Sequence, residues 1–160
     1  MIPASTPDGI SIRRALPPDA GAVRELTRSS YAKWVPVIGR EPLPMTADYQ
    51  RAIREHLVDL LFIGPQLAGM IETVNGNDHL LIENIAIAPA FQGHGHGRYL
   101  LGHAEALAAS LRLPELRLYT NKAFAWNVEF YGRHGYAVDR EEPFMGGFTV
   151  YMSKPVVLAQ

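Results

Sequence analysis

The chain has 160 residues, of which 48% are hydrophobic and 19% are charged, and its formal net charge is −1. This length suits one domain spanning residues 1–160, and the balanced charge argues against binding to the phosphate backbone of a nucleic acid. The absence of cysteine excludes disulfides, thiolate metal sites and cysteine nucleophiles. No apolar run reaches the roughly 18 residues of a membrane span, and the N-terminus lacks a signal-peptide pattern, so we expect a cytoplasmic protein without a membrane partner.

The first half of the chain predicts a strand, two helices and a hairpin. The run Pro17-Pro18-Asp19 predicts the start of the first helix, with Asp19 as the N-cap, and Val23, Leu26 and Ser30 follow on one helical face. Three prolines then make the chain irregular before a short helix. The predicted elements are a strand at 10–15, a helix that starts at 17–19, a helix at 46–56, and two hairpin strands at 60–63 and 67–74.

The second half begins with the nearly continuous apolar run 80–88, which predicts a central strand buried on both faces. Leu100, Ala104, Leu107 and Leu111 recur at helical spacing. Later elements are a strand at 116–120, a helix at 123–134 closed by Gly135, and an antiparallel pair at 136–139 and 148–153. A helix connects the strands at 80–88 and 116–120, so that pair should be parallel. The fold class is α+β, a mixed and mostly antiparallel sheet flanked by helices.

A glycine-rich loop lies between the central strand and the following helix. Gly93, Gly95 and Gly97 let the backbone approach a ligand closely, and the amides of the helix start form an anion site suited to a pyrophosphate. The spacing is not a Rossmann fingerprint, because position 98 is arginine and position 100 is leucine. No Gly-Lys-Ser/Thr follows, so it is not a Walker A loop either.

The spacing Gln92-x-x-Gly95-x-Gly97 resembles the Q/R-x-x-G-x-G/A loop of the GNAT family of acyl-CoA N-acyltransferases. The run Ile82 to Pro89 is similar to the strand before that loop, and Asn127 to Tyr131 with Gly135-Tyr136 is similar to the family's last helix and final strand start. The resemblance covers roughly residues 11–154. It implies a GNAT-like sheet with a splayed central parallel pair, acetyl-CoA as co-substrate, and acetyl transfer to an amine of a small molecule or peptide by direct attack in a ternary complex. Homodimers are frequent in the family, so a homodimer is an expectation.

The resemblance also implies which residues hold the coenzyme. Backbone groups of the central strand should bond the pantetheine, and the glycine loop should bind the diphosphate. The expected coenzyme-binding residues are Ile85, Ala86, Ile87, Gln92, Gly93, His94, Gly95, His96, Gly97, Arg98, Asn127 and Tyr131. We interpret the two loop histidines as solvent-facing rather than as a metal pair, because H-x-H needs further ligands and no carboxylate is nearby, so no metal is expected.

Two residues are candidates for acid–base chemistry. Glu83 is the candidate base, because a carboxylate inside an apolar strand is costly without a role or a partner. Its alternative role is to pair with an arginine or a backbone amide and hold the site together, and Glu72 is the alternative carboxylate. Tyr131 shares a helical face with Asn127, and the resemblance implies that its hydroxyl points at the coenzyme sulfur as the acid. The alternative is a core tyrosine with a satisfied hydroxyl.

The acceptor site is the least defined part of the sequence. Tyr31 and Trp34 either form an aromatic wall for the acceptor or cover the core. Tyr151 is a candidate for the opposite wall, and Glu72 is a further substrate-site candidate. Two other functions stay open: a non-catalytic domain that senses acyl-CoA, and a nucleotide-binding protein that uses the loop for another phosphate ligand.

Overall fold

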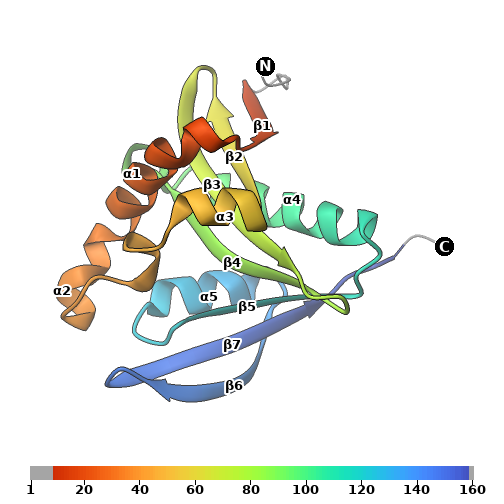
Figure 1. Ribbon diagram of the computed structural model, residues 1–160. Helices are drawn as coiled ribbons and strands as arrows, with labels where there is room; N and C mark the ends of the chain where they lie inside the picture. The colour runs from red at the N-terminus through yellow and green to blue at the C-terminus, as the bar shows by residue number, and fades with distance from the viewer. Residues whose placement is uncertain (1–8, 159–160) are drawn as a thin grey trace. The chain divides into compact units, whose positions relative to one another are not determined.

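The protein is described by a computed structural model that covers residues 9–158 (Figure 1). Most of the N-terminal segment considered above for a signal peptide therefore lies outside the described residues. The strands are β1 (Ile10–Arg14), β2 (Leu57–Ile63), β3 (Gln66–Asn75), β4 (Leu80–Ile87), β5 (Glu115–Asn121), β6 (Ala137–Phe144) and β7 (Gly147–Pro155). The α-helices are α1 (Ala20–Tyr31), α2 (Val35–Ile38), α3 (Tyr49–Glu55), α4 (His96–Ser110) and α5 (Ala125–Arg133). The predicted order of elements is confirmed, with the one-turn helix α2 added.

The chain divides into two compact units, with boundaries inside strands β3 and β4 and helix α4. Hydrogen-bonded neighbours follow the order β1-β2-β3-β4 in the first unit and β4-β5-β7-β6 in the second, which makes seven strands in all. Among the strand pairs with a described register, only β4 and β5 run parallel, with Leu80–Ile82 opposite Leu116–Leu118. The predicted mixed, mostly antiparallel class with this parallel pair is confirmed. A single domain over residues 1–160 stays a prediction.

The first unit places α1 and α3 on one face of its strands (Figure 1). Val23, Leu26 and Ser30 are buried along α1, as the helical spacing predicted. Tyr49 and Ala52 of α3 join the same hydrophobic core. The core holds the helices against β2, β3 and the end of β4, the strand that leads into the glycine loop.

Asp19 does not cap α1 with its side chain, contrary to the prediction. Asp19 does occupy the N-cap position of α1, and Pro17–Asp19 form a 3-10 turn directly ahead of it, so the helical segment starts at Pro17 as predicted. The Asp19 carboxylate instead accepts a hydrogen bond from the Leu16 amide at 2.7 Å and forms an ion pair with Arg13 at 2.8 Å. The Arg13 hydrogen bond is the main reason why the pKa of Asp19 lies below its usual value.

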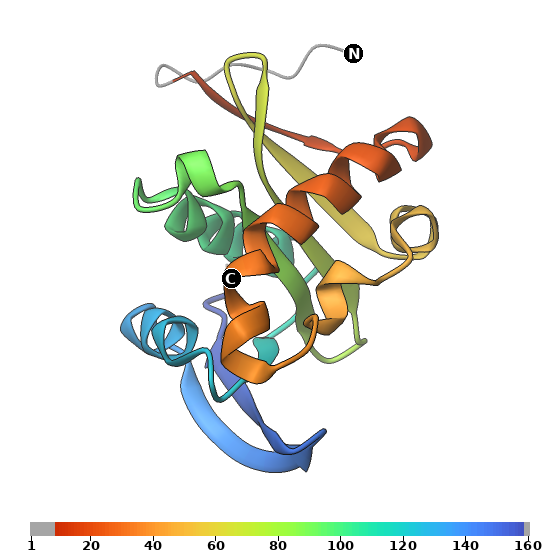
Figure 2. The same cartoon turned by 90° about the vertical axis from the view of Figure 1, so that its left-hand side faces the viewer.

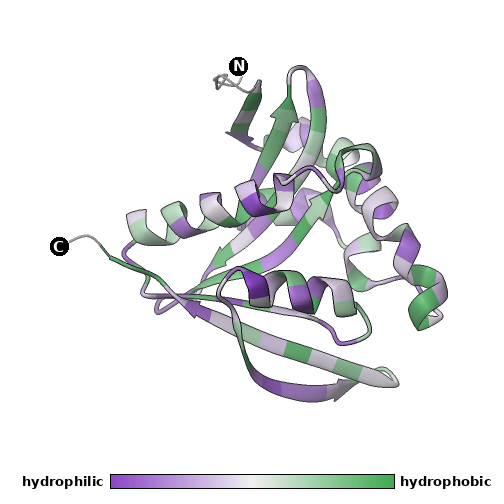
Figure 3. Cartoon of the chain, turned by 180° about the vertical axis from the view of Figure 1, so that it is seen from behind, coloured by the Kyte–Doolittle hydropathy of each residue, from purple (hydrophilic) through white to green (hydrophobic). Residues whose placement is uncertain are grey.

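The second unit carries α5 against one face of its sheet (Figures 1 and 3). Side chains along β5 alternate, with Leu116 and Leu118 buried and Arg117 and Tyr119 exposed. Strand β6 is exposed along its length and largely hydrophilic (Figure 3). Leu111, predicted on the apolar stripe of the helix, lies beyond the end of α4 and is exposed, because Arg112 turns the chain with a positive φ before Pro114.

Strand β4 is not buried on both faces, so that prediction is wrong. Its residues alternate between buried and half-buried, and Ile82 and Asn84 point to the buried side whereas Glu83 and Ile85 point to the other. Successive side chains of a strand leave on opposite faces, and only one face here is fully covered. None of the described helices combines the length and apolar character needed to cross a membrane.

Gly69 marks a close approach between β3 and the end of β4. A Cβ atom built there would lie 2.8 Å from Ile87 Cδ1 and 3.0 Å from the Ala86 carbonyl oxygen. We expect Gly69→Ala to destabilise the fold by about 1–3 kcal/mol through overpacking, which is a decrease in Tm of about 2–4 °C for each kcal/mol. Thermal unfolding followed by circular dichroism measures this. The control is Gly102→Ala in α4, where no atom lies within 4 Å of the new Cβ, and an unchanged Tm for Gly69→Ala would contradict the expectation.

Candidate active site

The glycine loop leaves β4 through a 3-10 turn at Pro89–Phe91 and enters α4 at His96 (Figure 2). Gly93 and Gly95 have φ values of 80° and 86°, a region that favours glycine. No atom lies within 4 Å of a Cβ built at either position, so the backbone conformation and not crowding requires glycine. The first helical hydrogen bond runs from the Tyr99 amide to the Gly95 carbonyl at 3.1 Å. The amides that precede Tyr99 therefore start the helix without intrahelical acceptors, which makes an anion-binding geometry.

Gln92 fixes the start of the loop through its side-chain amide. Its Nε2 donates to the Ile87 carbonyl at 2.9 Å, and its Oε1 accepts from Lys33 Nζ at 3.0 Å. Burial lowers the pKa of Lys33 from its usual value. Sequence reasoning missed Lys33, which is 59 residues away along the chain, because no local pattern connects the two.

The loop histidines lie near one another without forming a cluster of ligands. The ring centroids of His94 and His96 are 6.2 Å apart, and His96 meets Phe91 edge-on at 6.1 Å. Within residues 9–158 no group of three or more His, Cys, Asp or Glu side chains has a geometry that could hold a metal ion. Arg98 is exposed in the first turn of α4.

A buried amide on β4 connects the helices of the first unit to the strand. Asn84 Oδ1 accepts a hydrogen bond from the Tyr31 hydroxyl at 2.8 Å, and its Nδ2 donates to the Tyr49 hydroxyl at 3.0 Å. The Tyr31 hydroxyl also lies 3.2 Å from the Ile85 carbonyl, in the backbone segment expected to bond pantetheine. Tyr31 thus holds the end of α1 against β4. Trp34, three residues later, is half-buried, and its ring centroid lies 5.4 Å from Lys33 Nζ.

Glu83 is half-buried rather than buried, because it points to the less covered side of β4. Its Oε1 accepts a hydrogen bond from the Tyr119 hydroxyl at 2.5 Å. The described partner is thus a phenol, not the arginine or backbone amide that the alternative reading predicted. Sequence reasoning missed Tyr119, although parallel pairing of β4 and β5 with the alternation of both strands could have placed it beside Glu83.

Glu72 is the more deeply buried carboxylate of the two candidates. It lies on β3 with 5% of its surface exposed, and its Oε2 is 2.6 Å from His56 Nδ1. His56 follows the last residue of α3 and is partly exposed. This imidazole is a partner that the sequence pattern did not indicate.

Tyr131 lies in α5 and is 6% exposed. Burial raises its pKa above the usual tyrosine value, so the phenol keeps its proton through the neutral range. The ring meets Phe130 and Tyr136 edge-on, at 5.5 and 5.9 Å between centroids. Asn127, one turn earlier, is half-buried. Tyr131 can therefore donate a proton, and it cannot act as a base near neutral pH.

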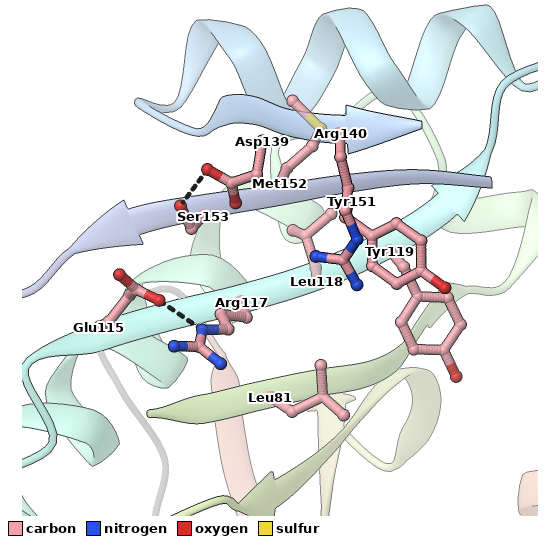
Figure 4. A pocket seen from close by; sticks show the side chains of 10 residues that line it. All are labelled: Leu81, Glu115, Arg117, Leu118, Tyr119, Asp139, Arg140, Tyr151, Met152 and Ser153. Carbon is pink, nitrogen blue, oxygen red and sulfur yellow. Dashed lines mark hydrogen bonds and ion pairs between the residues drawn. The ribbon is translucent and has the colours of Figure 1, made fainter. Parts of the chain in front are cut away.

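An open groove of about 560 Å³ runs over the exposed face of β5, β7 and β6 in the second unit (Figure 4). Tyr151 lies in it, with its ring centroid 6.0 Å from that of Tyr119 and 3.9 Å from Arg140 Cζ. Arg117 and Glu115 form an ion pair at one end. The groove combines aromatic surface with charges of both signs.

Comparison with known proteins gives matches at the levels of family and fold. The model of the acetyltransferase (GNAT) family matches residues 22–136. The PaiA N-acetyltransferase of Thermoplasma acidophilum, solved with coenzyme A, is similar with a TM-score of 0.78 and 22% identity over 91% of this chain and 98% of that one. The ribosomal-protein-S18-alanine N-acetyltransferase of Escherichia coli is similar with a TM-score of 0.76 and 19% identity, over 94% of this chain and 96% of that one. A GNAT family acetyltransferase of Elizabethkingia anophelis with acetyl-CoA bound is similar with a TM-score of 0.69 and 15% identity, over 93% of this chain and 99% of that one. A search of curated proteins by sequence found no match.

Proposed function

We propose, from the premise that this chain belongs to the GNAT family of acetyltransferases, that it moves the acetyl group of acetyl-CoA directly to an amine in a ternary complex. The observation that carries the proposal is the loop Gln92–Gly97, in which two glycines with positive φ precede the first turn of α4. That geometry suits a diphosphate. The presence of both Glu83 and Tyr131 favours catalysis over an acyl-CoA sensor that lacks turnover.

In this proposal the coenzyme is held by backbone groups and a few side chains. The diphosphate bonds the amides of Gly93 to Arg98, with His94 and His96 beside it. The pantetheine bonds the backbone of Ile85 to Ile87, in the family's splayed parallel pair, and Asn127 contacts it from α5. Gln92 supports the loop through its hydrogen bond to the Ile87 carbonyl, so the loop and the strand end act as one cradle.

Glu83 is the proposed base. An alkyl amine is mostly protonated at neutral pH, since its pKa is about 10.4, and it must lose a proton before it attacks. Tyr119 occupies Oε1 of Glu83, which leaves Oε2 to accept that proton directly or through water. Glu72 is the second choice, because it is buried and already paired with His56.

Tyr131 is the proposed acid. The amine nitrogen attacks the thioester carbonyl carbon, the carbon–sulfur bond breaks, and the departing thiolate takes the phenol proton of Tyr131. The nitrogen then gives up its second proton to form the neutral amide, and that proton restores the phenol, directly or through water. Because burial keeps that phenol protonated, it is in the required state at neutral pH. Tyr31, Trp34 and Tyr151 are the proposed acceptor-site residues.

Release of free coenzyme A thiol from acetyl-CoA tests the activity and defines the acceptor. The panel is spermidine, phenethylamine, an aminoglycoside, and a short peptide with a free N-terminus. We expect at least one amine to raise thiol release well above hydrolysis by water, with stoichiometric acetylated product seen by mass spectrometry. Saturable binding of acetyl-CoA with no turnover on any amine would favour the sensor instead.

A further inference from the structure

We propose that Tyr119 is a positioning residue for the Glu83 carboxylate, held by a cross-strand row of side chains on the open face of the second unit. This cross-strand row consists of Arg140 on β6, Tyr151 on β7, Tyr119 on β5 and Glu83 on β4. The inference rests on the proposed function, in which Glu83 is the base. It adds the element that determines which way that base points.

The row follows the strand register directly. Arg140 lies opposite Tyr151 in the β6–β7 pair, and Tyr151 lies opposite Tyr119 in the β5–β7 pair. The parallel β4–β5 register ends at Ile82 opposite Leu118, so Glu83 and Tyr119 are the next residues of each strand. Cross-strand neighbours on one face lie within reach of aromatic and long side chains. The four side chains are therefore brought together by the sheet itself.

Each contact in the row has a defined geometry. Arg140 Cζ lies 3.9 Å from the centroid of the Tyr151 ring, the two tyrosine rings are 6.0 Å apart, and the Tyr119 hydroxyl is 2.5 Å from Glu83 Oε1. Figure 4 shows Arg140, Tyr151 and Tyr119 side by side in the groove. A guanidinium stacked on an aromatic face and a tilted aromatic pair are both favourable contacts, so each side chain restricts the rotamers of the next.

A β-bulge in β6 gives Arg140 its place in the row. The register of β6 shifts between Val138 and Arg140, so Asp139 is the extra residue and Arg140 comes opposite Tyr151. Such bulges re-aim side chains beside functional sites. Asp139 points to the same face, where its carboxylate accepts a hydrogen bond from Ser153 Oγ at 3.1 Å. Without the bulge, the position opposite Tyr151 would hold aspartate instead of the stacking arginine.

The row matters chemically because Glu83 is only half-buried. A carboxylate in that position has freedom to turn toward solvent unless a neighbour holds it. The phenol of Tyr119 donates to one oxygen in a charge-assisted hydrogen bond, which fixes the carboxylate plane and leaves the other oxygen to accept the amine proton. Tyr119 thus acts through Glu83, whereas Glu83 itself meets the acceptor.

Tyr119→Phe tests this, because it removes the hydroxyl and keeps the ring against Tyr151. Loss of a hydrogen bond to a charged group is expected to lower kcat about 10- to 100-fold with the KM for acetyl-CoA unchanged. In a Glu83→Gln background the same change should have no further effect, since there is no carboxylate left to position. The assay uses the panel amine with the highest kcat/KM. Hydrolysis of acetyl-CoA by water, measured without amine, compares wild type and variant in a reaction that does not depend on the acceptor.

The matched control is Arg117→Gln, which removes a charge from the same groove whose ion-pair partner is Glu115 and not a member of the cross-strand row, and it should leave kcat unchanged. A Tyr119→Phe variant with wild-type kcat, or one whose loss is as large in the Glu83→Gln background, overturns the positioning role. If Glu83→Gln lowers kcat while Tyr119→Phe does not, only this inference is wrong. If Glu83→Gln keeps wild-type turnover, the proposed base is wrong and the inference is overturned with it.

Discussion

Replacement of Tyr131 by phenylalanine is expected to lower kcat by about 10²- to 10⁴-fold, the usual range for loss of a general acid or base. The phenol is buried, and burial raises its pKa, so it is protonated at neutral pH and can donate to the sulfur as the carbon–sulfur bond breaks. Phenylalanine preserves the ring and its edge contacts with Phe130 and Tyr136. Acetyl-CoA should therefore bind as before, and steady-state kinetics with calorimetric titration of acetyl-CoA separates the two effects.

Tyr136 supplies the matched control for this prediction. It is a buried tyrosine beside Tyr131, and its hydroxyl has no hydrogen-bond partner among the described residues. Removing an unsatisfied hydroxyl costs little, so Tyr136→Phe should keep wild-type kcat. Equal turnover in wild type and Tyr131→Phe, or equal losses in both variants, would remove the assigned role of Tyr131.

Replacement of Gly95 by valine is expected to raise the Kd for acetyl-CoA about 10- to 100-fold, which corresponds to losing a hydrogen bond to a charged group. Gly95 has a φ of 86°, which a β-branched residue adopts only with strain. The loop must then change its backbone, and the amides at the start of α4 lose their common direction. Titration calorimetry of the variant measures the change.

Gly102→Ala in the same helix is the control, because a Cβ there meets no other atom. It should bind acetyl-CoA like the wild type. We expect Gly95→Val to stay folded, because Gly95 lies in an exposed loop and nothing lies within 4 Å of a Cβ built there. Thermal unfolding of the variant checks this. A folded Gly95→Val variant with wild-type affinity would mean that the loop conformation does not govern coenzyme binding.

Local patterns predicted the elements and the loop well, because both depend on neighbouring residues. The glycine spacing indicated a loop before a helix whose backbone can approach a ligand closely, and Gly93 and Gly95 adopt positive φ values there. The helical connection between β4 and β5 predicted their parallel pairing, which the register confirms. The family assignment from the Gln92–Gly97 loop is confirmed by the match over residues 22–136.

The partners of the site residues could not be predicted in the same way, because they come from distant segments. Tyr119 is 36 residues from Glu83, and Tyr31 is 53 residues from Asn84. The apolar run 80–88 also did not indicate which of its residues face the core, because it is nearly continuous. Asn84 is the buried polar residue of β4 and Glu83 is not, because the position of a strand relative to its covering layer is decided by tertiary packing.

Titration of the chain with acetyl-CoA and with S-acetylpantetheine, which has the thioester but no diphosphate, tests most directly whether the amides before Tyr99 hold the coenzyme. The proposed site predicts micromolar binding of acetyl-CoA and binding of S-acetylpantetheine weaker by about 100-fold or more, the equivalent of two lost charge-assisted hydrogen bonds. Equal affinity for both compounds, or binding of NAD or ATP but not of acetyl-CoA, would contradict it.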